Sequence, residues 1–189
     1  MLYATIGEHK PALLQYTRCL VVHEHIFGKD HPSTATSYMN CGSSRMALGL
    51  IDRALEQFRK ALAIRRDNFG KFHYKVADIH VWMGDLYFTQ KSDYQAAVAE
   101  FRKALEIFMQ CTGPEHIETA STRQKLGQAL FRDDDLDGAL NEYHECLRVY
   151  AILAANSTHP QKANICPYIG TILERQKDYD GAEAMVREA

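Results

Sequence analysis

Apolar residues recur along the chain at the spacing of amphipathic helices. Over residues 32 to 48 the small and apolar positions follow i, i+3, i+4, i+7 intervals, and Pro32 stands where the first turn of a helix tolerates proline. A second stretch, 52 to 68, carries a stripe formed by Ala54, Leu55, Phe58, Ala61, Leu62 and Ile64. A break at Gly49 separates the two stretches. The pattern predicts a pair of helices joined by a short turn.

The same helix pair returns along the whole chain. Its clearest marker is a histidine that recurs after 42, 43 and 43 residues, at His31, His73, His116 and His159. A glycine follows each histidine after eleven residues, at Gly42, Gly84, Gly127 and Gly170. Each unit then repeats the order small, large apolar, small, as at Ala54, Phe58 and Ala61. Such self-similarity predicts a solenoid of stacked units, because one unit alone cannot bury its apolar face.

The register divides the chain into a single array over residues 1–189. Complete units span 28–69, 70–112 and 113–155, with partial units at 1–27 and 156–189, so we expect a fragment of a longer array. The two intervals of 43 place one extra residue near 91–93 and one near 151–155. We expect turns to absorb both, since an insertion inside a helix would rotate its apolar stripe by about 100°.

Glycine and proline at special positions give further expectations. Glycine inside a helix costs about 1 kcal/mol relative to alanine, so Gly42 and its equivalents need a compensating reason. We expect them to admit the second helix of the same unit at its alanines, here Ala54. The unit boundaries carry residues that tolerate the left-handed backbone of a helix C-terminus: Gly28, Gly70, Gly113 and Asn156. Pro167 falls inside a first helix and is expected to kink it.

The order of small and aromatic positions resembles the tetratricopeptide repeat, whose usual unit has about 34 residues. The residues that carry this likeness are Cys41, Gly42, Arg45, Ala54, Phe58, Ala61 and their equivalents. The longer unit of 42 residues, and phrases such as Phe-Arg-Lys-Ala-Leu-Glu-Ile at 101–107, are similar to the repeats of kinesin light chains. The resemblance implies an all-α fold, a right-handed α-α superhelix of antiparallel helix pairs whose first helices line a concave groove.

The resemblance also implies a non-catalytic scaffold that binds a peptide segment of a partner protein in that groove, as a cargo adaptor like a kinesin light chain would. First helices of that family usually carry an Asn-Asn pair that holds the peptide backbone, and here only Asn40 survives. The residues expected to line the groove are Asn40, Trp82, Asp85, Phe88, Lys125, Gln128, Phe131, Arg132, Thr171 and Arg175.

The residue types at these positions favour an acidic ligand with apolar anchors. Arg132 and Arg175 recur in register one unit apart and could pair with acidic side chains of one ligand. The aromatic residues would hold apolar side chains of the peptide. Trp82 and Phe131 could equally pack between units, so both readings stay open for them.

Composition and charge exclude several other classes. The 22 Lys and Arg against 24 Asp and Glu give a net charge of −2, so we expect no nucleic-acid partner, although a local basic stripe is compatible with this balance. Apolar runs are far shorter than the roughly 20 residues that span a bilayer, so we expect no membrane insertion. Five scattered cysteines without a C-x-x-C pair favour a reducing, cytoplasmic setting.

The sequence offers no catalytic motif, and we expect neither an enzyme nor a cofactor or metal. The repeated histidines would be separated by a stacked helix pair, about 10 Å, whereas zinc ligands lie near 2 Å from the ion, so a structural role in turns is favoured. Buried packing is favoured for Cys19, Cys41, Cys146 and Cys166, and Cys111 is expected to be reachable.

Two alternatives to a peptide-binding scaffold remain open. A chain cut inside a unit at both ends would expose the apolar stripe of its terminal helices, which would favour self-association. The repeats could also form the regulatory region of a larger enzyme or signalling protein. RNA binding through helical repeats is the least favoured alternative, given the net charge.

Overall fold

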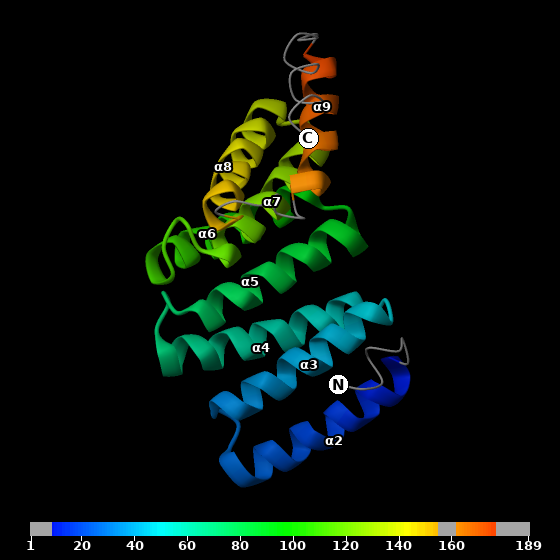
Figure 1. Ribbon diagram of the computed structural model, residues 1–189. Coiled ribbons are helices and arrows are strands. Elements are labelled where there is room, and N and C mark those ends of the chain that lie inside the picture. Colours follow the sequence, from blue (N-terminus) through cyan, green and yellow to red (C-terminus); the bar gives the residue numbers. More distant parts are fainter. Residues whose placement is uncertain (1–8, 155–161, 177–189) are drawn as a thin grey trace. The chain divides into compact units, whose positions relative to one another are not determined.

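The computed structural model describes residues 9–154 and 162–176, and their regular structure is entirely helical (Figure 1). The helices are α2 (His9–Phe27), α3 (Pro32–Ala47), α4 (Ile51–Phe69), α5 (Tyr74–Leu86), α6 (Tyr94–Cys111), α7 (Ile117–Arg132), α8 (Leu136–Ala154) and α9 (Lys162–Arg175). A π-helical turn, η1 (Tyr87–Lys91), follows α5. The predicted helices over 32–48 and 52–68 are confirmed as α3 and α4, with ends within one residue.

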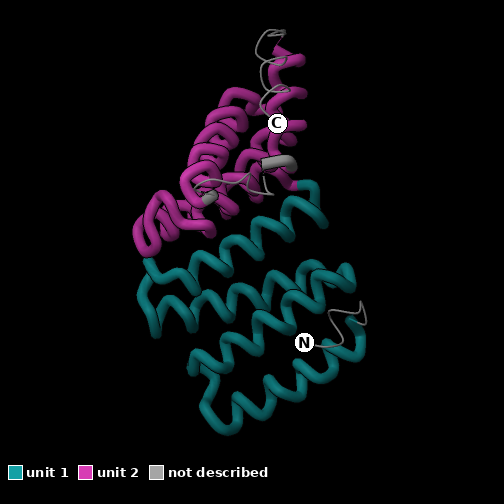
Figure 2. The backbone as a smooth tube through the Cα atoms, viewed as in Figure 1, with its two compact units in different colours: residues 1–92 teal, residues 93–189 magenta. Residues whose placement is uncertain are grey.

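The chain forms two compact units, residues 1–92 and 93–189 (Figure 2). In unit 1, α2 packs on α3, α3 on α4, and α4 on α5, with short turns between neighbours. In unit 2, α6 packs on α7, α7 on α8, and α8 on α9. Within each unit, first helices also touch across the helix between them, α3 with α5 and α7 with α9. Each unit therefore has the antiparallel helix pairs that the sequence predicts.

The repeated histidines cap the first helices. In each case the backbone N–H two residues further on donates to the imidazole Nδ1: Ser33 to His31 at 3.1 Å, Lys75 to His73 at 3.1 Å, and Glu118 to His116 at 3.2 Å. All three histidines have extended backbones, with φ of −81°, −104° and −82°. An orphan N–H of the first turn is thereby satisfied. The structural role predicted for these residues is confirmed, while His159 lies outside the described residues.

The boundaries between repeats also carry the glycine conformations that the sequence predicts. Gly70 ends α4 with φ of 81°, a left-handed value that side-chain-bearing residues rarely adopt, and Gly28 and Gly113 behave alike. Asp93 accepts a hydrogen bond from the N–H of Ala96 at 3.1 Å and so caps α6. The expected C-terminal role of Asn156 lies outside the described residues.

Gly42 and Gly127 admit an aromatic ring of the next helix. A Cβ on Gly42 would lie 2.5 Å from Cε1 of Phe58, and a Cβ on Gly127 would lie 2.8 Å from Cε1 of Tyr143. The predicted close approach of the second helix is confirmed. The atoms nearest to the glycine belong to the ring one turn beyond the alanine. A Cβ on Gly170 would meet none of the described residues within 4 Å, and the second helix expected to face it lies outside them.

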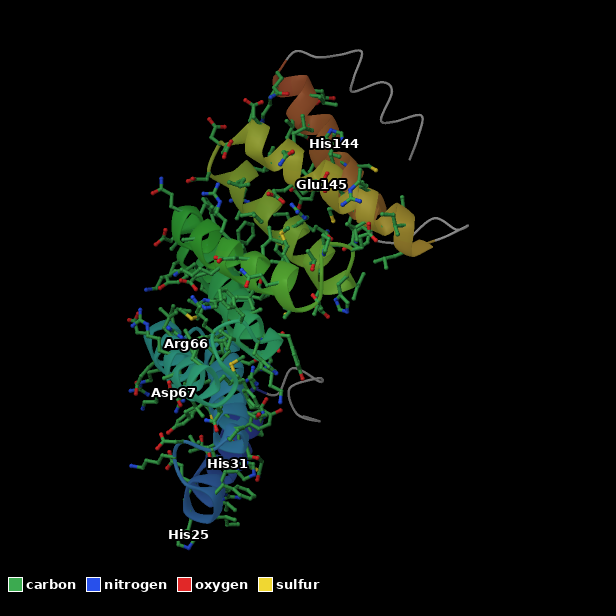
Figure 3. The ribbon with its side chains drawn as sticks, turned by 90° about the vertical axis from the view of Figure 1, so that its left-hand side faces the viewer. His25, His31, Arg66, Asp67, His144 and Glu145 are labelled. Atoms are coloured by element: carbon green, nitrogen blue, oxygen red, sulfur yellow. The ribbon has the colours of Figure 1, made fainter. Side chains whose placement is uncertain are left out.

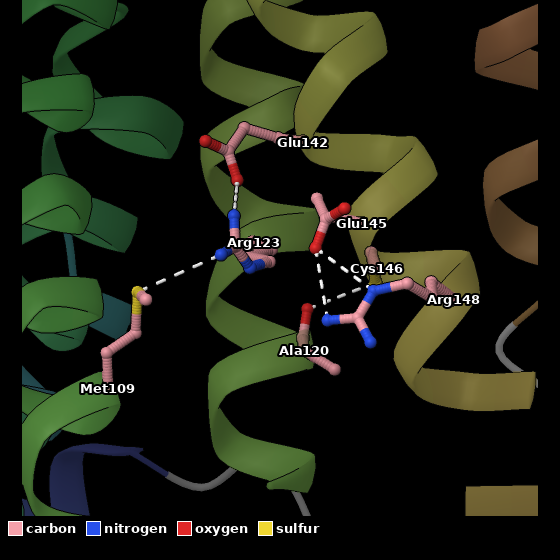
Figure 4. A network of polar contacts seen from close by, with 7 residues as sticks. All are labelled: Met109, Ala120, Arg123, Glu142, Glu145, Cys146 and Arg148. Atoms are coloured by element: carbon pink, nitrogen blue, oxygen red, sulfur yellow. Dashed lines mark hydrogen bonds and ion pairs between the residues drawn. The ribbon is translucent and has the colours of Figure 1, made fainter. Parts of the chain in front are cut away.

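A polar network joins α7 to α8 and to the end of α6 (Figure 4). Arg123 Nη1 pairs with Glu142 Oε2 at 2.6 Å, and both side chains are largely buried, with 12% and 16% exposed. Nη2 of the same arginine donates to Met109 Sδ at 3.8 Å, and the Cys146 thiol donates to the carbonyl of Ala120 at 3.1 Å. The network fixes α7, which carries four of the expected groove residues, against its neighbours.

Candidate functional site

The ten expected groove residues are divided between the two compact units. Nine lie on the first helices of repeats, and Phe88 lies in the turn η1 that follows α5. Unit 1 holds Asn40 on α3, Trp82 and Asp85 on α5, and Phe88 in η1. Unit 2 holds Lys125, Gln128, Phe131 and Arg132 on α7, and Thr171 and Arg175 on α9.

In unit 2 the structure brings α7 and α9 together through an aromatic and cationic cluster. Phe131 meets Tyr168 edge to face with ring centroids 5.8 Å apart. The guanidinium carbon of Arg175 lies 4.8 Å from the Phe131 centroid, within the range of a cation–π interaction. Phe131 is only half-buried, so its ring both packs between helices and reaches the surface. Packing between repeats is confirmed for this residue, and its role as a peptide anchor stays a prediction.

Arg132 is held beside this cluster by a residue that the sequence did not indicate. Its Nη2 donates to the Tyr94 hydroxyl at 2.6 Å, and its guanidinium carbon lies 4.9 Å from the Tyr94 ring centroid. Tyr94 begins α6, a second helix, and stands in register with Ile51 and Leu136. An aromatic residue where the other repeats have an aliphatic one is the feature of the sequence that could have indicated this contact. Arg132 remains exposed, with its guanidinium oriented by the phenol.

The second arginine of the cluster already has an acidic neighbour. Arg175 Nη1 lies 3.7 Å from Asp134 Oδ1, and the Asp134 side chain is 86% exposed. An exposed ion pair of this kind contributes about 0–1 kcal/mol, so another carboxylate can replace Asp134 at little cost. Thr171, also exposed, donates to the carbonyl of Pro167 at 2.9 Å within α9. Helix α9 continues through Pro167 from Lys162 to Arg175.

In unit 1 the predicted anchor Trp82 lies at the surface of the core. Its ring centroid is 6.2 Å from that of Phe58, and the residue remains 36% exposed. Asn40, Asp85 and Phe88 are half-buried. Trp82 therefore packs on α4, the second helix of the preceding repeat, while part of its ring stays exposed.

The turn η1 was not predicted. It contains Phe88 and ends at Ser92, which has a left-handed backbone with φ of 50°. The extra residue of the 43-residue interval was assigned to the turn near 91–93, yet the helix end accommodates it by widening into a π-helical turn. Such turns absorb one inserted residue without breaking the helix. The other extra residue, near 151–155, falls partly outside the described residues.

The thiols divide into buried and accessible groups. Cys41 and Cys146 are buried, which raises the pKa of both and brings that of Cys146 to about 12. Cys111 is exposed, as predicted, whereas Cys19 is exposed against the prediction that it faces the core. The described residues contain no group of three or more His, Cys, Asp or Glu side chains arranged to hold a metal ion. Within the same residues no helix has the length and apolar character needed to cross a bilayer.

Comparison with known proteins decides the family. A model described as tetratricopeptide repeat matches residues 1–67 and 75–152, and a second with the same description matches residues 39–110. The chain belongs to the tetratricopeptide repeat family. The fold of this family is generally a non-catalytic scaffold for protein interactions.

Individual relatives refine this assignment. The tetratricopeptide repeats here are 26% identical to Protein KINESIN LIGHT CHAIN-RELATED 1 of Arabidopsis thaliana, over 90% of this chain and 28% of the relative. They are 24% identical to the Clustered mitochondria protein homolog of Homo sapiens, over 94% of this chain and 13% of the relative. The chain therefore spans less than a third of either relative. The crystal structure of BtubC (BKLC) from P. vanneervenii matches with a TM-score of 0.86 at 23% identity, covering 99% of this chain and 74% of that one. Similarity to kinesin light chains is thus confirmed for the repeats.

Proposed function

We propose that the tetratricopeptide array binds an acidic peptide segment of a partner protein on the α7/α9 face of unit 2. The observation that carries this proposal is the pairing of each exposed arginine with an aromatic ring, Arg132 with Tyr94 and Arg175 with Phe131. An arginine stacked on a ring loses less side-chain freedom when it binds, and its planar fork suits a carboxylate. Lys125, half-buried on the same helix as Arg132, adds positive charge.

Apolar contacts would supply much of the affinity. Phe131 on α7 and Tyr168 on α9 form a half-buried aromatic pair, which suits an apolar side chain of the peptide. Binding energy at such surfaces concentrates in aromatic and arginine anchors. In unit 1, Trp82 on α5 is a separate anchor of the same kind, and α3 carries the single retained asparagine, Asn40. A role as a cargo adaptor is part of this proposal and rests on the likeness to kinesin light chain-related proteins.

A peptide-display selection tests the proposal. Random peptides selected on the wild-type chain should be enriched in Asp and Glu next to aromatic or aliphatic residues. Synthetic versions should bind Arg132→Glu/Arg175→Glu at least tenfold more weakly, because each reversal places a carboxylate against an acidic ligand. Arg59→Glu/Arg102→Glu is the matched control, since both arginines are exposed on second helices, α4 and α6. Equal binding to wild type and the Arg132/Arg175 variant would overturn the assignment.

A further inference from the structure

The turn between α4 and α5 in unit 1 alternates aromatic and basic residues. Its sequence over 69–75 is Phe-Gly-Lys-Phe-His-Tyr-Lys, which contains no acidic residue. Phe72 is 39% exposed and Tyr74 is 46% exposed. In register, Phe72 corresponds to Asp30 and Glu115 of the neighbouring turns, so the fold does not require an aromatic ring at that position. We call residues 69–75 the aromatic turn.

Each exposed ring of the aromatic turn lies beside a lysine ammonium. Lys71 Nζ is 4.5 Å from the Phe72 centroid, and Lys75 Nζ is 5.9 Å from that of Tyr74 and 4.7 Å from that of Phe69. The result is two ring-and-ammonium pairs on one short segment.

The capping histidine holds this segment in place. His73 stacks on Phe69 with centroids 4.6 Å apart and lies 4.5 Å from the Tyr74 ring, while its Nδ1 accepts from the N–H of Lys75. Arg65, buried below, donates to the Lys75 carbonyl at 2.7 Å and lies 3.9 Å from Asp78. The rings are thus presented from an ordered backbone, which reduces the entropy lost on binding.

The charges around the aromatic turn are mixed. Asn68 donates to the carbonyl of Asp30, which brings the exposed Lys29 and Asp30 of the preceding turn close, and Arg65 offsets Asp78. At the end of α4, Arg66 is exposed and followed by the exposed carboxylate of Asp67 (Figure 3). These two charges offset each other, so the charge of the segment comes from Lys71 and Lys75. The net charge of −2 excludes a uniformly basic surface, but not a basic segment of this size.

We propose that the aromatic turn binds single-stranded nucleic acid, with bases stacked on Phe72 and Tyr74 and phosphates beside Lys71 and Lys75. Single strands are bound without sequence preference where aromatic rings alternate with cations, because every base has a stacking face and every nucleotide a phosphate. One ring with one ammonium matches one nucleotide, and the turn has two such pairs. An acidic peptide would use the lysines but has no planar group at every residue, so the exposed rings favour nucleic acid.

Fluorescence anisotropy with a labelled oligouridylate of about 10 nucleotides, in about 50 mM salt, tests the proposal. Phe72→Ala/Tyr74→Ala should weaken binding about tenfold or more, because stacking is lost at both rings. Lys71→Gln/Lys75→Gln should reduce the slope of log K against log salt by about 0.7 for each phosphate contact removed.

The preceding turn offers matched controls. Phe27 and Lys29 are exposed and stand in register with Phe69 and Lys71, so Phe27→Ala and Lys29→Gln should bind the oligonucleotide like wild type. Arg132→Glu/Arg175→Glu should also bind it like wild type, which separates this test from that of the peptide face. Far-UV circular dichroism checks that each variant is folded.

Three results would overturn the proposal. They are no binding of the oligouridylate by the wild-type chain, unchanged binding by Phe72→Ala/Tyr74→Ala, and displacement of the oligonucleotide by polyglutamate at equal charge concentration. The last result would assign the aromatic turn to acidic peptides. Polyglutamate that competes much more weakly supports the stacking site.

Discussion

The ring of Phe58 occupies the space that a side chain at residue 42 would need. We expect Gly42→Ala to destabilise the protein by about 1–3 kcal/mol, since the new Cβ would lie 2.5 Å from Cε1 and must displace a buried ring. Gly170→Ala is the control for the backbone change, because a Cβ there meets none of the described residues within 4 Å. It should be neutral or stabilise by up to about 1 kcal/mol through helix propensity.

Thermal unfolding of the two variants measures this difference in stability. The melting temperature should fall for Gly42→Ala and stay level or rise for Gly170→Ala. A fall of similar size in both variants would show that the loss comes from the backbone rather than from Phe58.

The sequence predicted that Gly42 is closely approached, but not by which side chain. Ala54 and Phe58 lie on one stripe one helical turn apart, about 5.4 Å along the axis. Whether Ala54 or Phe58 lies nearer to the glycine depends on how far the two helices are shifted along their axes. The apolar periodicity carries no information on that shift.

At the scale of single helices, the caps can be tested one at a time. His116 is exposed, and its Nδ1 accepts a hydrogen bond from the N–H of Glu118. His116→Ala should lower the free energy of unfolding by about 1 kcal/mol, because a first-turn N–H loses its acceptor. His116→Asn keeps a side-chain acceptor and should restore most of that loss. Urea unfolding measures both, and equal stability of the alanine and asparagine variants would contradict the capping role.

Helix positions and the structural role of the turn histidines followed from the sequence, whereas the partners of the site residues did not. Arg132 and Arg175 looked equivalent because they occupy the same place in consecutive units. In the structure one stacks on Tyr94 of a second helix, and the other on Phe131 of a first helix and beside Asp134. These contacts join residues about 40 positions apart, so they depend on side chains that vary between units and not on the repeat itself.

For the molecule as a whole, buried phenols predict sensitivity to alkaline pH. Burial raises the pKa of Tyr38 to about 12, helped by the hydrogen bond that its hydroxyl donates to Glu24, and burial also raises the pKa of Tyr143 and Tyr150. The unfolded value is about 10, so the folded state favours the neutral phenol. This stabilisation is fully present below pH 10 and is lost as the pH rises toward about 12.

The urea midpoint should therefore fall as the pH is raised from about 10 toward 12, and Tyr38→Phe should show a smaller fall because its ring cannot ionise. The absorbance of tyrosinate, followed over the same pH range, reports the ionisation independently. An identical pH profile for wild type and Tyr38→Phe would remove this residue from the explanation.

The histidine caps have one more consequence, which concerns how such chains arise. Each cap joins an imidazole to a backbone group only two residues away, so the start of the helix is specified inside the segment that forms it. A stretch of gene that encodes one helix pair therefore carries its own boundary wherever it is copied. Duplication or loss of such a cassette changes the number of pairs without erasing where each one begins.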